Sequence, residues 1–351
     1  MNNPQHDLAT LNALLSSDEH GRVTAHYQDC SISSVYQPIF SLSHRRPVGY
    51  EALSRISRDG SGVLAPSAFF RQSRQESDNV MVDRLCRALH MRNFAGYQDS
   101  AWIFLNVNPL VTVLGKNYGS FFKELLESNH IAPGQVVVEI LENGIYDETI
   151  LAAAVDYYKD LGCLIALDDF GAAHSNFDRI WNLQPDIVKF DRSIVQQAEA
   201  SRKVRKALPG LVALIQELGC LTLMESVETE PQALIAMDAN VDLVQGYYFG
   251  YPSEYLVNAD YRSDIMLQLT HKHAGFAADV RRRNQLRLES PQVEFARVLQ
   301  QLKLGSARFE QACARLLALD NVMRIYCLDE HGDQIGGNIG NEQTLGRADP
   351  R

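Results

Sequence analysis

The sequence lacks the features that mark several large classes of protein. No apolar run reaches the roughly 18 residues of a membrane-spanning helix. Residues 1–22 show no basic segment followed by an apolar one, so we expect no secretory signal. The six cysteines form no CxxC pair, which argues against a zinc site or a disulfide framework and favours a reduced chain in the cytoplasm. A net charge of −10 disfavours a general DNA- or RNA-binding surface.

Common catalytic motifs are also missing. The chain has no GxxxxGK[ST] phosphate loop, no GxSxG nucleophile elbow, no glycine-rich dinucleotide fingerprint and no HExxH pair. His174 lies beside an acidic pair, but we interpret it as a loop residue. What the chain does contain is 43 acidic residues, so any chemistry is expected to rest on carboxylates.

Eight short apolar runs recur between residues 35 and 250. Most are bounded by Gly, Pro or Asn and show no polar alternation, which is typical of strands buried on both faces. The runs cover residues 35–42, 48–56, 102–109, 136–142, 164–170, 187–194, 221–227 and 243–250. Helix-length amphipathic stretches lie between most of them, at residues 66–73, 80–96, 118–128, 148–161, 201–218 and 229–239.

Alternating strands and helices predict parallel strands, and eight strands predict a (β/α)8 barrel of the TIM type in the α/β class. The first two runs are joined only by the short segment SHRRP. A link of that length suits a hairpin, so we expect this one pair to be antiparallel and the others to be parallel.

Polar side chains lie inside these runs or at their C-terminal parts. The C-terminal ends of parallel barrel strands meet at one mouth, so we expect these side chains to be neighbours. One acid at a strand end is as often a solvated turn residue, but a set drawn from seven strands is poorly explained that way. The set is Glu51, Asn106, Glu139, Asp168, Asp169, Lys189, Glu225 and Gln245.

Carboxylate and amide oxygens are hard ligands that suit Mg²⁺ or Mn²⁺ better than zinc. The adjacent Asp168 and Asp169 can bridge two metals about 3.5–4 Å apart. Such a pair of metals can activate water and stabilise the leaving oxygen of an in-line phosphoryl displacement. Lys189 can orient that water or neutralise developing charge. The alternative for Lys189 is a salt bridge inside the carboxylate cluster.

Eight ordered motifs resemble those of the EAL-domain c-di-GMP phosphodiesterases. Each tripeptide alone is a weak signal, but the order and spacing over about residues 25–255 are specific. The motifs are YQPIF at 36–40, GYEALSR at 49–55, NVNP at 106–109, EILE at 139–142, DDFG at 168–171, PDIVKFDRSIV at 185–195, ESVET at 225–229 and QGYYFGYP at 245–252.

The resemblance implies a barrel with an antiparallel first strand, c-di-GMP as substrate, linear 5′-pGpG as product, a homodimer, and two cations, Mg²⁺ or Mn²⁺, with Ca²⁺ inhibitory. It also implies roles for matching positions. Glu51, Asn106, Glu139 and Asp168 match ligands of one metal, Asp168 and Asp169 serve the second, and Glu225 matches a further metal-site acid. Lys189 matches the residue that handles the nucleophilic water, and Glu228 and Gln245 match residues supporting that site. Gln37, Leu53 and Arg55 match positions that contact the nucleotide, and we assign Gln245 to the same substrate-binding group.

Three positions depart from the family's pattern. Ala173 and Ser226 stand where glycine is usual, and Leu141 stands where threonine is usual. A backbone with positive φ at Ala173 or Ser226 costs about 1 kcal/mol or more in a residue other than glycine. No ligand position is lost, so we expect these departures to affect the rate of the reaction rather than its type.

The remainder of the chain has a different pattern. Residues 255–287 are polar and predicted to be helical, and the basic triplet at 281–283 is interpreted as a solvated helix face. Two further helices are expected at 290–304 and 306–319, split at Gly305, before a strand-turn-strand at 323–337. This resembles the opening of a PAS- or Cache-like sensory domain. We predict an N-terminal extension at 1–24, the barrel at 25–255, a helical linker at 256–288 and a partial sensory segment with a disordered end at 289–351.

Two other functions compete with catalysis. The domain can be a receptor that binds c-di-GMP and barely cleaves it, or a barrel that has lost the ligand and binds a protein partner. An interaction-only barrel has no physical reason to keep five mutually repelling carboxylates at one rim. The complete acidic set with Lys189 therefore favours the enzyme.

Overall fold

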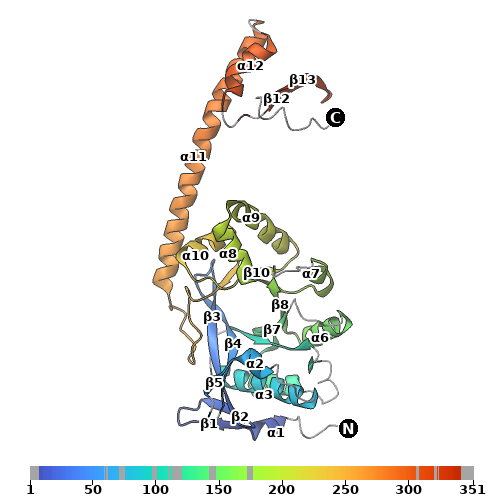
Figure 1. The fold of residues 1–351 in the computed structure, drawn as a ribbon, viewed down its shortest axis with the longest axis vertical. Coiled ribbons are helices and arrows are strands. Elements are labelled where there is room, and N and C mark those ends of the chain that lie inside the picture. The colour runs from blue at the N-terminus through green and yellow to red at the C-terminus, as the bar shows by residue number, and fades with distance from the viewer. Residues whose placement is uncertain are drawn as a thin grey trace. The chain divides into compact units, whose positions relative to one another are not determined.

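A closed barrel of eight strands forms the centre of the larger part of the chain (Figure 1). The computed structural model describes residues 8–58, 60, 62–70, 76–96, 101–109, 111–112, 121–141, 148–171, 177–305, 308–319, 322 and 324–340. The chain divides into two compact units, Met1–Thr270 and His271–Arg351. No helix among the described residues has the length and hydropathy needed to cross a membrane.

The barrel confirms the predicted fold class and the antiparallel β3–β4 pair, but closure adds a second antiparallel pair that was not predicted. Strand β3 runs antiparallel to both of its neighbours, β4 and β11, whereas every other neighbouring pair around the barrel is parallel. The barrel strands are β3 (Cys30–Ser41), β4 (Arg46–Arg58), β6 (Trp102–Asn106), β7 (Val136–Leu141), β8 (Leu164–Phe170), β9 (Ile187–Phe190), β10 (Leu221–Met224) and β11 (Leu243–Gln245).

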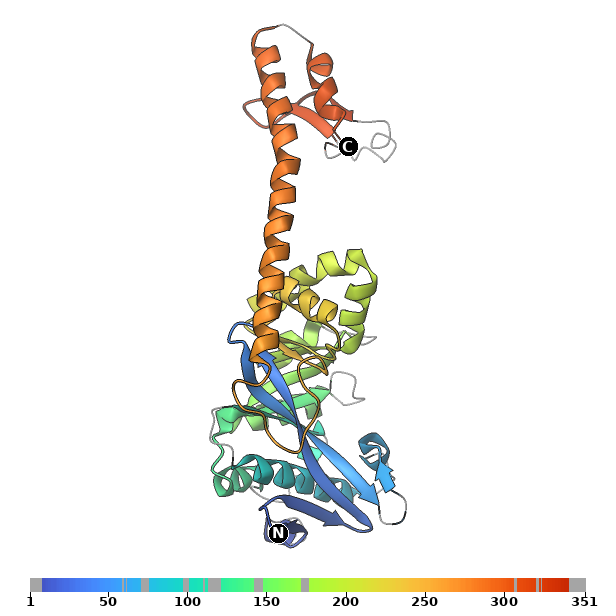
Figure 2. The ribbon, with the colours of Figure 1, turned by 90° about the vertical axis from the view of Figure 1, so that its left-hand side faces the viewer.

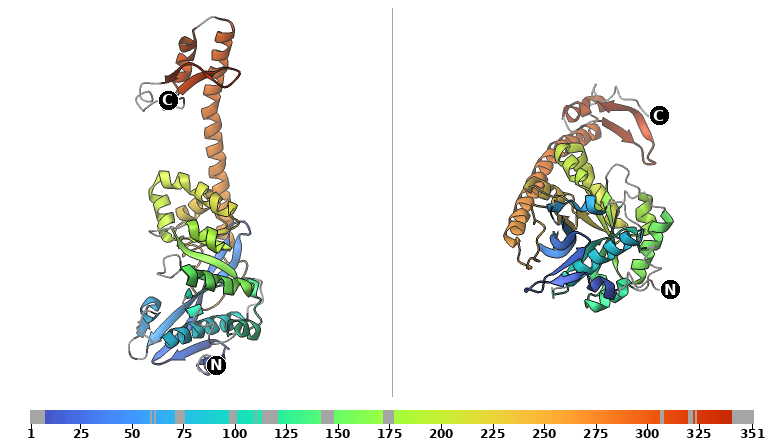
Figure 3. Two further views of the ribbon diagram at one scale, coloured as in Figure 1. Left: turned by 90° about the vertical axis from the view of Figure 1, so that its right-hand side faces the viewer. Right: turned by 60° about the horizontal axis from the view of Figure 1, so that its bottom comes forward.

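Helices lie outside the strands, as Figure 3 shows in its right-hand view. The outward faces of the strands and the inward faces of these helices make one large apolar core. The helices are α2 (Pro66–Phe70), α3 (Glu76–Phe94), α5 (Phe121–Ser128), α6 (Glu148–Asp160), α7 (Phe177–Leu183), α8 (Arg192–Ala200), α9 (Arg202–Glu217) and α10 (Glu230–Asp238), and a 3-10 turn covers Pro133–Gln135.

Several predicted strands end earlier than expected, and the far end of one of them belongs to a helix. The run at residues 187–194 remains a strand only as far as Phe190. Asp191 then caps α8, because its side chain accepts a hydrogen bond from the Ser193 N–H at 2.9 Å. The apolar residues after the cap therefore face the core from a helix, and neither α7 nor α8 was predicted.

The interior of the barrel begins with an apolar layer to which seven strands each contribute one side chain. These are Ile39, Phe104, Val137, Ala166, Ile187, Leu223 and Leu243. Strand β4 contributes Gly49 at this level, and a Cβ there would lie 2.9 Å from the ring of Phe104. The missing side chain of Gly49 therefore makes room for the aromatic ring that fills the barrel.

Strands β3 and β4 are longer than the barrel requires, and the N-terminal residues pair with the excess length. Figure 2 shows the two long blue strands side by side, with the N-terminal elements at one end of them. Strand β2 (Val23–Tyr27) pairs with β3, and β1 (Leu15–Ser17) pairs with β2. Helix α1 (Leu8–Asn12) precedes them, and β5 (Gly62–Leu64) pairs with β4. The sequence did not predict these additions.

One long helix forms where two helical segments were predicted. Helix α11 (Ser263–Lys303) begins later than residue 255 and continues through Pro291 without a break. The surrounding residues are strong helix formers, so their propensity outweighs the single backbone hydrogen bond that proline removes. Helix α12 (Phe309–Leu317) and the antiparallel hairpin of β12 (Arg324–Leu328) and β13 (Gln334–Gly340) follow, as predicted.

Candidate active site

Eight of the site residues predicted from the sequence form one layer inside the barrel. Each lies two positions from a residue of the apolar layer, as Glu139 does from Val137, and in the antiparallel β3 the step runs backward from Ile39 to Gln37. Side chains alternate between the two faces of a strand, so a step of two keeps both residues inside. The layer consists of Gln37, Glu51, Asn106, Glu139, Asp168, Lys189, Glu225 and Gln245.

Lys189 lies at the centre of three of the carboxylates. Its Nζ is 3.1 Å from Asp168 Oδ1 and 2.5 Å from Glu225 Oε1, and it also pairs with Glu139 Oε1. The side chain is 1% exposed. The salt bridge that we considered for Lys189 is therefore present in this structure, and the ammonium group holds together acids that would otherwise repel one another.

Burial sets the protonation of this cluster. It lowers the pKa of Lys189, but Asp168, Glu139 and Glu225 outweigh burial and hold that pKa well above its usual value. Burial raises the pKa of Glu139 well above its ordinary range and that of Glu225 to about 8, with Lys189 opposing both shifts. One lysine therefore does not neutralise all of these acids, so the cluster can accept further positive charge.

A chain of amide and carboxylate groups lies next to this cluster. Asn106 Nδ2 donates to Glu51 Oε1 at 2.9 Å, and Gln245 Nε2 donates to Glu51 Oε2 at 2.7 Å. Gln245 Nε2 also lies 3.2 Å from Gln37 Oε1, and Gln37 Nε2 donates to the Gly250 carbonyl. Glu51 is thus oriented from both sides by predicted site residues.

The pair Asp168 and Asp169 interrupts the regular alternation of β8. The pairing of β8 with β9 shifts register between Leu167 and Phe170, and Asp169 has φ +61°. Such an irregularity bends a strand and redirects its side chains. Burial and the neighbouring Asp168 carboxylate raise the pKa of Asp169, which places both acids in one electrostatic environment.

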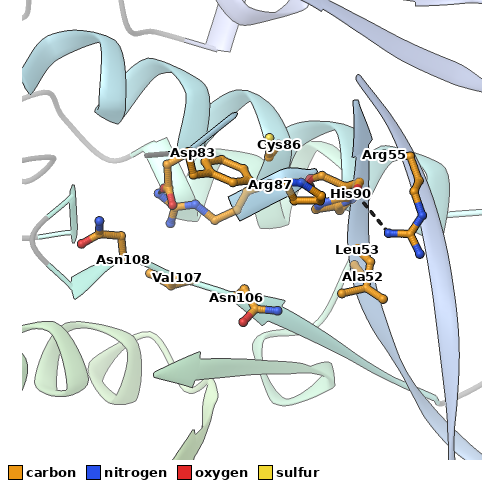
Figure 4. A pocket seen from close by; sticks show the side chains of 13 residues that line it. Ala52, Leu53, Arg55, Asp83, Cys86, Arg87, His90, Asn106, Val107 and Asn108 are labelled. Atoms are coloured by element: carbon orange, nitrogen blue, oxygen red, sulfur yellow. Dashed lines mark hydrogen bonds and ion pairs between the residues drawn. The ribbon is translucent and has the colours of Figure 1, made fainter. Parts of the chain in front are cut away.

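Two cavities open beside the polar layer. The first, about 350 Å³, is lined by Glu51, Glu225 and Gln245 together with Arg192, Tyr247 and others. Glu228 also lines it and pairs with Arg192 at 3.5 Å. The second, about 360 Å³, lies between strand β4, helix α3 and the end of β6 (Figure 4). Leu53 lines both cavities, and Arg55 and Asn106 line the second.

The EAL domain family profile matches residues 22–252, which is more than half of the chain. The chain belongs to the EAL domain family. The matched residues include the whole barrel and the polar layer inside it.

Similar proteins extend this likeness. YkuI of Bacillus subtilis, an EAL-domain-containing protein, is 28% identical over 314 residues, covering 87% of this chain and 76% of YkuI. Its crystal structure in complex with c-di-GMP and calcium superimposes with a TM-score of 0.75 at 29% identity, covering 89% of this chain and 80% of that one. RocR of Pseudomonas aeruginosa, a cyclic di-GMP phosphodiesterase, is 30% identical over 62% of this chain, which spans 56% of RocR.

The side chains of the EAL site fit a divalent cation in chemistry. Glu139 Oε2 and Gln245 Oε1 are buried without a hydrogen-bond partner among the described residues, and oxygen donors of this kind suit hard cations. In the described part of the chain, no three Asp, Glu, His or Cys side chains are gathered as a ready ligand set. The Lys189 ammonium group lies among three of the carboxylates, so metal binding requires these side chains to adjust.

Several residues of the two cavities were not predicted from the sequence. Arg192, Tyr247, Asp83, Arg87 and His90 line them. Arg192 and Tyr247 lie within motifs from which we predicted other residues, and this position is their only signal in the sequence. Ala173, His174 and Glu142 fall outside the described residues.

Ser226 has the backbone conformation that a non-glycine residue adopts at a cost. Its φ is +53°, and it lies between Glu225 and Glu228 in the loop after β10. That loop is held against the end of β11: Val227 N–H donates to the Gln245 carbonyl at 3.0 Å. A Cβ at Gly246 would lie 2.2 Å from the Val227 carbonyl oxygen, so the contact depends on glycine. The loop therefore cannot relax easily to relieve Ser226.

We expect Ser226→Gly to raise the free energy of unfolding by about 0.5–1 kcal/mol. The left-handed conformation costs an L-residue about 1–2 kcal/mol, and the greater freedom of unfolded glycine cancels part of the gain. Chemical denaturation measures the effect. Ser226→Ala keeps the Cβ and is the control, so an equal gain in that variant would show that the strain is not the cause.

His90 makes the stability of the domain depend on pH. It is buried against Ser34 Oγ at 2.7 Å and Ser54 Oγ at 3.2 Å, and burial lowers its pKa to about 4. Folding therefore favours the neutral ring. This contribution is fully present above the unfolded value of about 6.5 and is lost as the pH falls toward 4, a change of about 3 kcal/mol.

This dependence can be measured as the difference in unfolding free energy between pH 7 and pH 4. His90→Gln keeps a polar side chain that does not titrate, and it should lose about 3 kcal/mol less over this interval than the wild type. Identical slopes for the two proteins would show that His90 is not the group responsible.

Proposed function

We propose that this chain hydrolyses c-di-GMP to linear 5′-pGpG. The observation that carries the proposal is the polar layer of the barrel, in which every strand delivers an acid, an amide or Lys189 to one level. The similarity to RocR, a cyclic di-GMP phosphodiesterase, and to YkuI, crystallised with c-di-GMP and calcium, supports this substrate.

The cations are proposed to be Mg²⁺ or Mn²⁺. Glu51, Asn106, Glu139, Asp168, Asp169 and Glu225 are the residues proposed to hold them. Two bound cations would supply an activated water and would neutralise charge on the phosphodiester. Their charge would also favour the ionised forms of Glu139 and Glu225, whose pKa values burial raises.

The remaining side chains are proposed to orient the attacking water and to bind the nucleotide. Lys189 orients the attacking water and balances developing charge, and Glu228 with Gln245 supports that region. Arg55 offers a guanidinium to a phosphate oxygen, Leu53 an apolar contact to a base, and Gln37 an amide to the nucleotide. We further propose that one guanine enters the cavity of Figure 4, where the Asp83 carboxylate can accept its N–H groups.

Purified protein incubated with c-di-GMP tests the function directly. With Mg²⁺ or Mn²⁺ we expect linear 5′-pGpG as the product by chromatography. Activity should disappear in chelator, and Ca²⁺ should inhibit, because its longer and looser coordination does not place the water correctly. Full turnover in Ca²⁺ alone would contradict a tightly positioned two-metal site.

One observation favours a receptor that barely cleaves the nucleotide as the second candidate. Ser226 strains the loop that carries Glu225 and Glu228. Binding of c-di-GMP in Ca²⁺, combined with no product in Mn²⁺ over hours, would establish the receptor and exclude the enzyme.

The setting of the protein is also a proposal. We propose that the chain works in the cytoplasm as a homodimer, with c-di-GMP rather than DNA or RNA as its nucleotide partner. All six cysteines are free thiols, which suits a reducing compartment. Exposed apolar side chains on unit 1, such as Trp181 at 55% and Leu214 at 48%, can supply a contact surface. Sedimentation of the purified chain measures the oligomeric state.

A further inference from the structure

A ring of polar contacts links two helices to the segment that follows β6. Arg87 of α3 donates from Nη1 to the Tyr158 hydroxyl of α6 at 2.6 Å and from Nη2 to Asp83 Oδ2. The Tyr158 hydroxyl lies 3.2 Å from Thr112 Oγ1, and Thr112 donates to the Asn108 carbonyl from both N (3.2 Å) and Oγ1 (3.4 Å). The Asn108 backbone N–H favours the ionised Asp83 carboxylate and opposes the rise in its pKa that burial causes, which links the last two members of the ring.

The bonds of this ring can all be aligned in one direction. Arg87 has only donors, so the Tyr158 hydroxyl accepts from it and is left with its own hydrogen to give to Thr112 Oγ1, which lies within hydrogen-bond distance. The Thr112 hydroxyl in turn donates to the Asn108 carbonyl. Both branches that leave Arg87 therefore end on the one peptide group of Asn108, at its carbonyl and through Asp83 at its N–H. Bonds aligned in this way polarise one another.

The ring is buried and packed on aromatic side chains. Arg87 is 4% exposed, Thr112 5% and Tyr158 0%. The Arg87 guanidinium lies 5.6 Å from the ring centroid of Phe122, and Phe122 packs edge-to-face on Tyr158 at 5.1 Å. Because a buried polar group that loses its partner is costly, the ring resists opening.

The clamped peptide lies two residues after a proposed metal ligand. Asn106 ends β6 and donates to Glu51, and the intervening Val107 N–H donates to the Glu139 carbonyl at 3.1 Å. The backbone after β6 is therefore fixed on one side by β7 and on the other by the ring. Figure 4 shows Arg87 beside Asp83, with Asn106, Val107 and Asn108 along one segment of the same cavity wall.

We propose that Arg87 and Tyr158 are positioning residues that hold the Asn106 amide in place at the metal site. They do so through Asp83 and Thr112, which fix the Asn108 peptide. Neither residue is a proposed ligand of the cation. The inference rests on the proposed function for the role of Asn106, and it adds a structural cause for the geometry of that ligand.

Two variants open the ring at different bonds while keeping the packing. Tyr158→Phe removes only the hydroxyl, and Thr112→Val removes the next hydroxyl in the relay. Thr222→Val is the matched control, because Thr222 is buried (0% exposed) and its hydroxyl donates to Asp242 at 2.8 Å at the start of β10, away from the polar layer. All three should lower the melting temperature by similar amounts.

Binding of Mn²⁺, measured by electron paramagnetic resonance without substrate, separates the ring from the control. We expect Tyr158→Phe and Thr112→Val each to weaken Mn²⁺ binding about tenfold, as the loss of an outer-shell partner does, and the control to leave it unchanged. The double variant should lose little more than either single one, since both open the same ring. Mn²⁺ affinities equal to that of the control would overturn the proposal.

The same titration distinguishes the two levels of inference. A wild-type chain that binds Mn²⁺ but does not cleave c-di-GMP overturns the proposed function and leaves the positioning role to be decided by the variants. A wild-type chain that binds no Mn²⁺ overturns the metal assignment and the positioning role together.

Discussion

Glu51→Ala is expected to reduce hydrolysis of c-di-GMP by at least about a hundredfold. Glu51 is a proposed metal ligand that Asn106 and Gln245 hold at 2.9 and 2.7 Å. Its removal deletes a donor and frees the two amides that orient it. Binding of the nucleotide should survive better than turnover, because Arg55 and the base contacts are untouched. Steady-state kinetics and calorimetric titration measure the two effects.

Glu217→Ala, at the end of the outer helix α9, is the control for loss of an acidic residue. It should leave both turnover and binding unchanged. If Glu51→Ala turned over c-di-GMP at the wild-type rate, the metal assignment of this residue would be wrong.

Lys189→Met is expected to affect stability and catalysis together. Methionine fills a similar volume but leaves three acids without their shared partner, and breaking a buried ion pair costs about 3–5 kcal/mol. Turnover should fall by at least about a hundredfold, since the proposed partner of the attacking water is lost. Added Mn²⁺ should restore part of the stability by neutralising the acids, but it should not restore turnover.

Lys159→Met tests whether the loss of any hydrogen-bonded lysine would lower stability and turnover in the same way. Lys159 donates to the carbonyls of Leu183 and Gln184 at 2.9 and 2.8 Å, and within the described residues it forms no salt bridge. We expect Lys159→Met to lower the free energy of unfolding by about 1 kcal/mol and to leave the turnover of c-di-GMP unchanged. Stability of Lys189→Met equal to that of the wild type in chelator would show that the carboxylates do not depend on the ammonium group.

Much of the barrel follows from local signals in the sequence. Each buried strand is short and continuously apolar, and each is bounded by turn residues. Each can therefore be predicted from residues that are close together in the chain. The antiparallel first pair followed from the length of one link. The polar layer was predictable as a group because the C-terminal ends of the strands meet at one mouth.

What the sequence did not predict depends on contacts between distant residues. The spacing of two positions between the apolar and polar layers depends on strand register, which barrel closure determines. The ring through Arg87 joins residues 71 positions apart in the chain, and nothing in the local pattern of either helix indicates the pairing. We considered a positive φ at Ser226 but could not predict it from the local pattern. The close approach of Gly246 to Val227 imposes this conformation, and Gly246 lies in another loop.

Strand β3 pairs with β11, so the barrel is sealed by partners about 200 positions apart in the chain. The proposed site spans this seam, because Gln37 and Gln245 meet across it. During synthesis the β3–β4 hairpin can form early, but its free edge has to wait until residue 245 has left the ribosome. The pocket is consequently completed in the last step of folding, and a partly made chain has no catalytic layer. Pairing over so long a loop is slow, which makes the early edge of β3 the place where nascent chains are most exposed to aggregation.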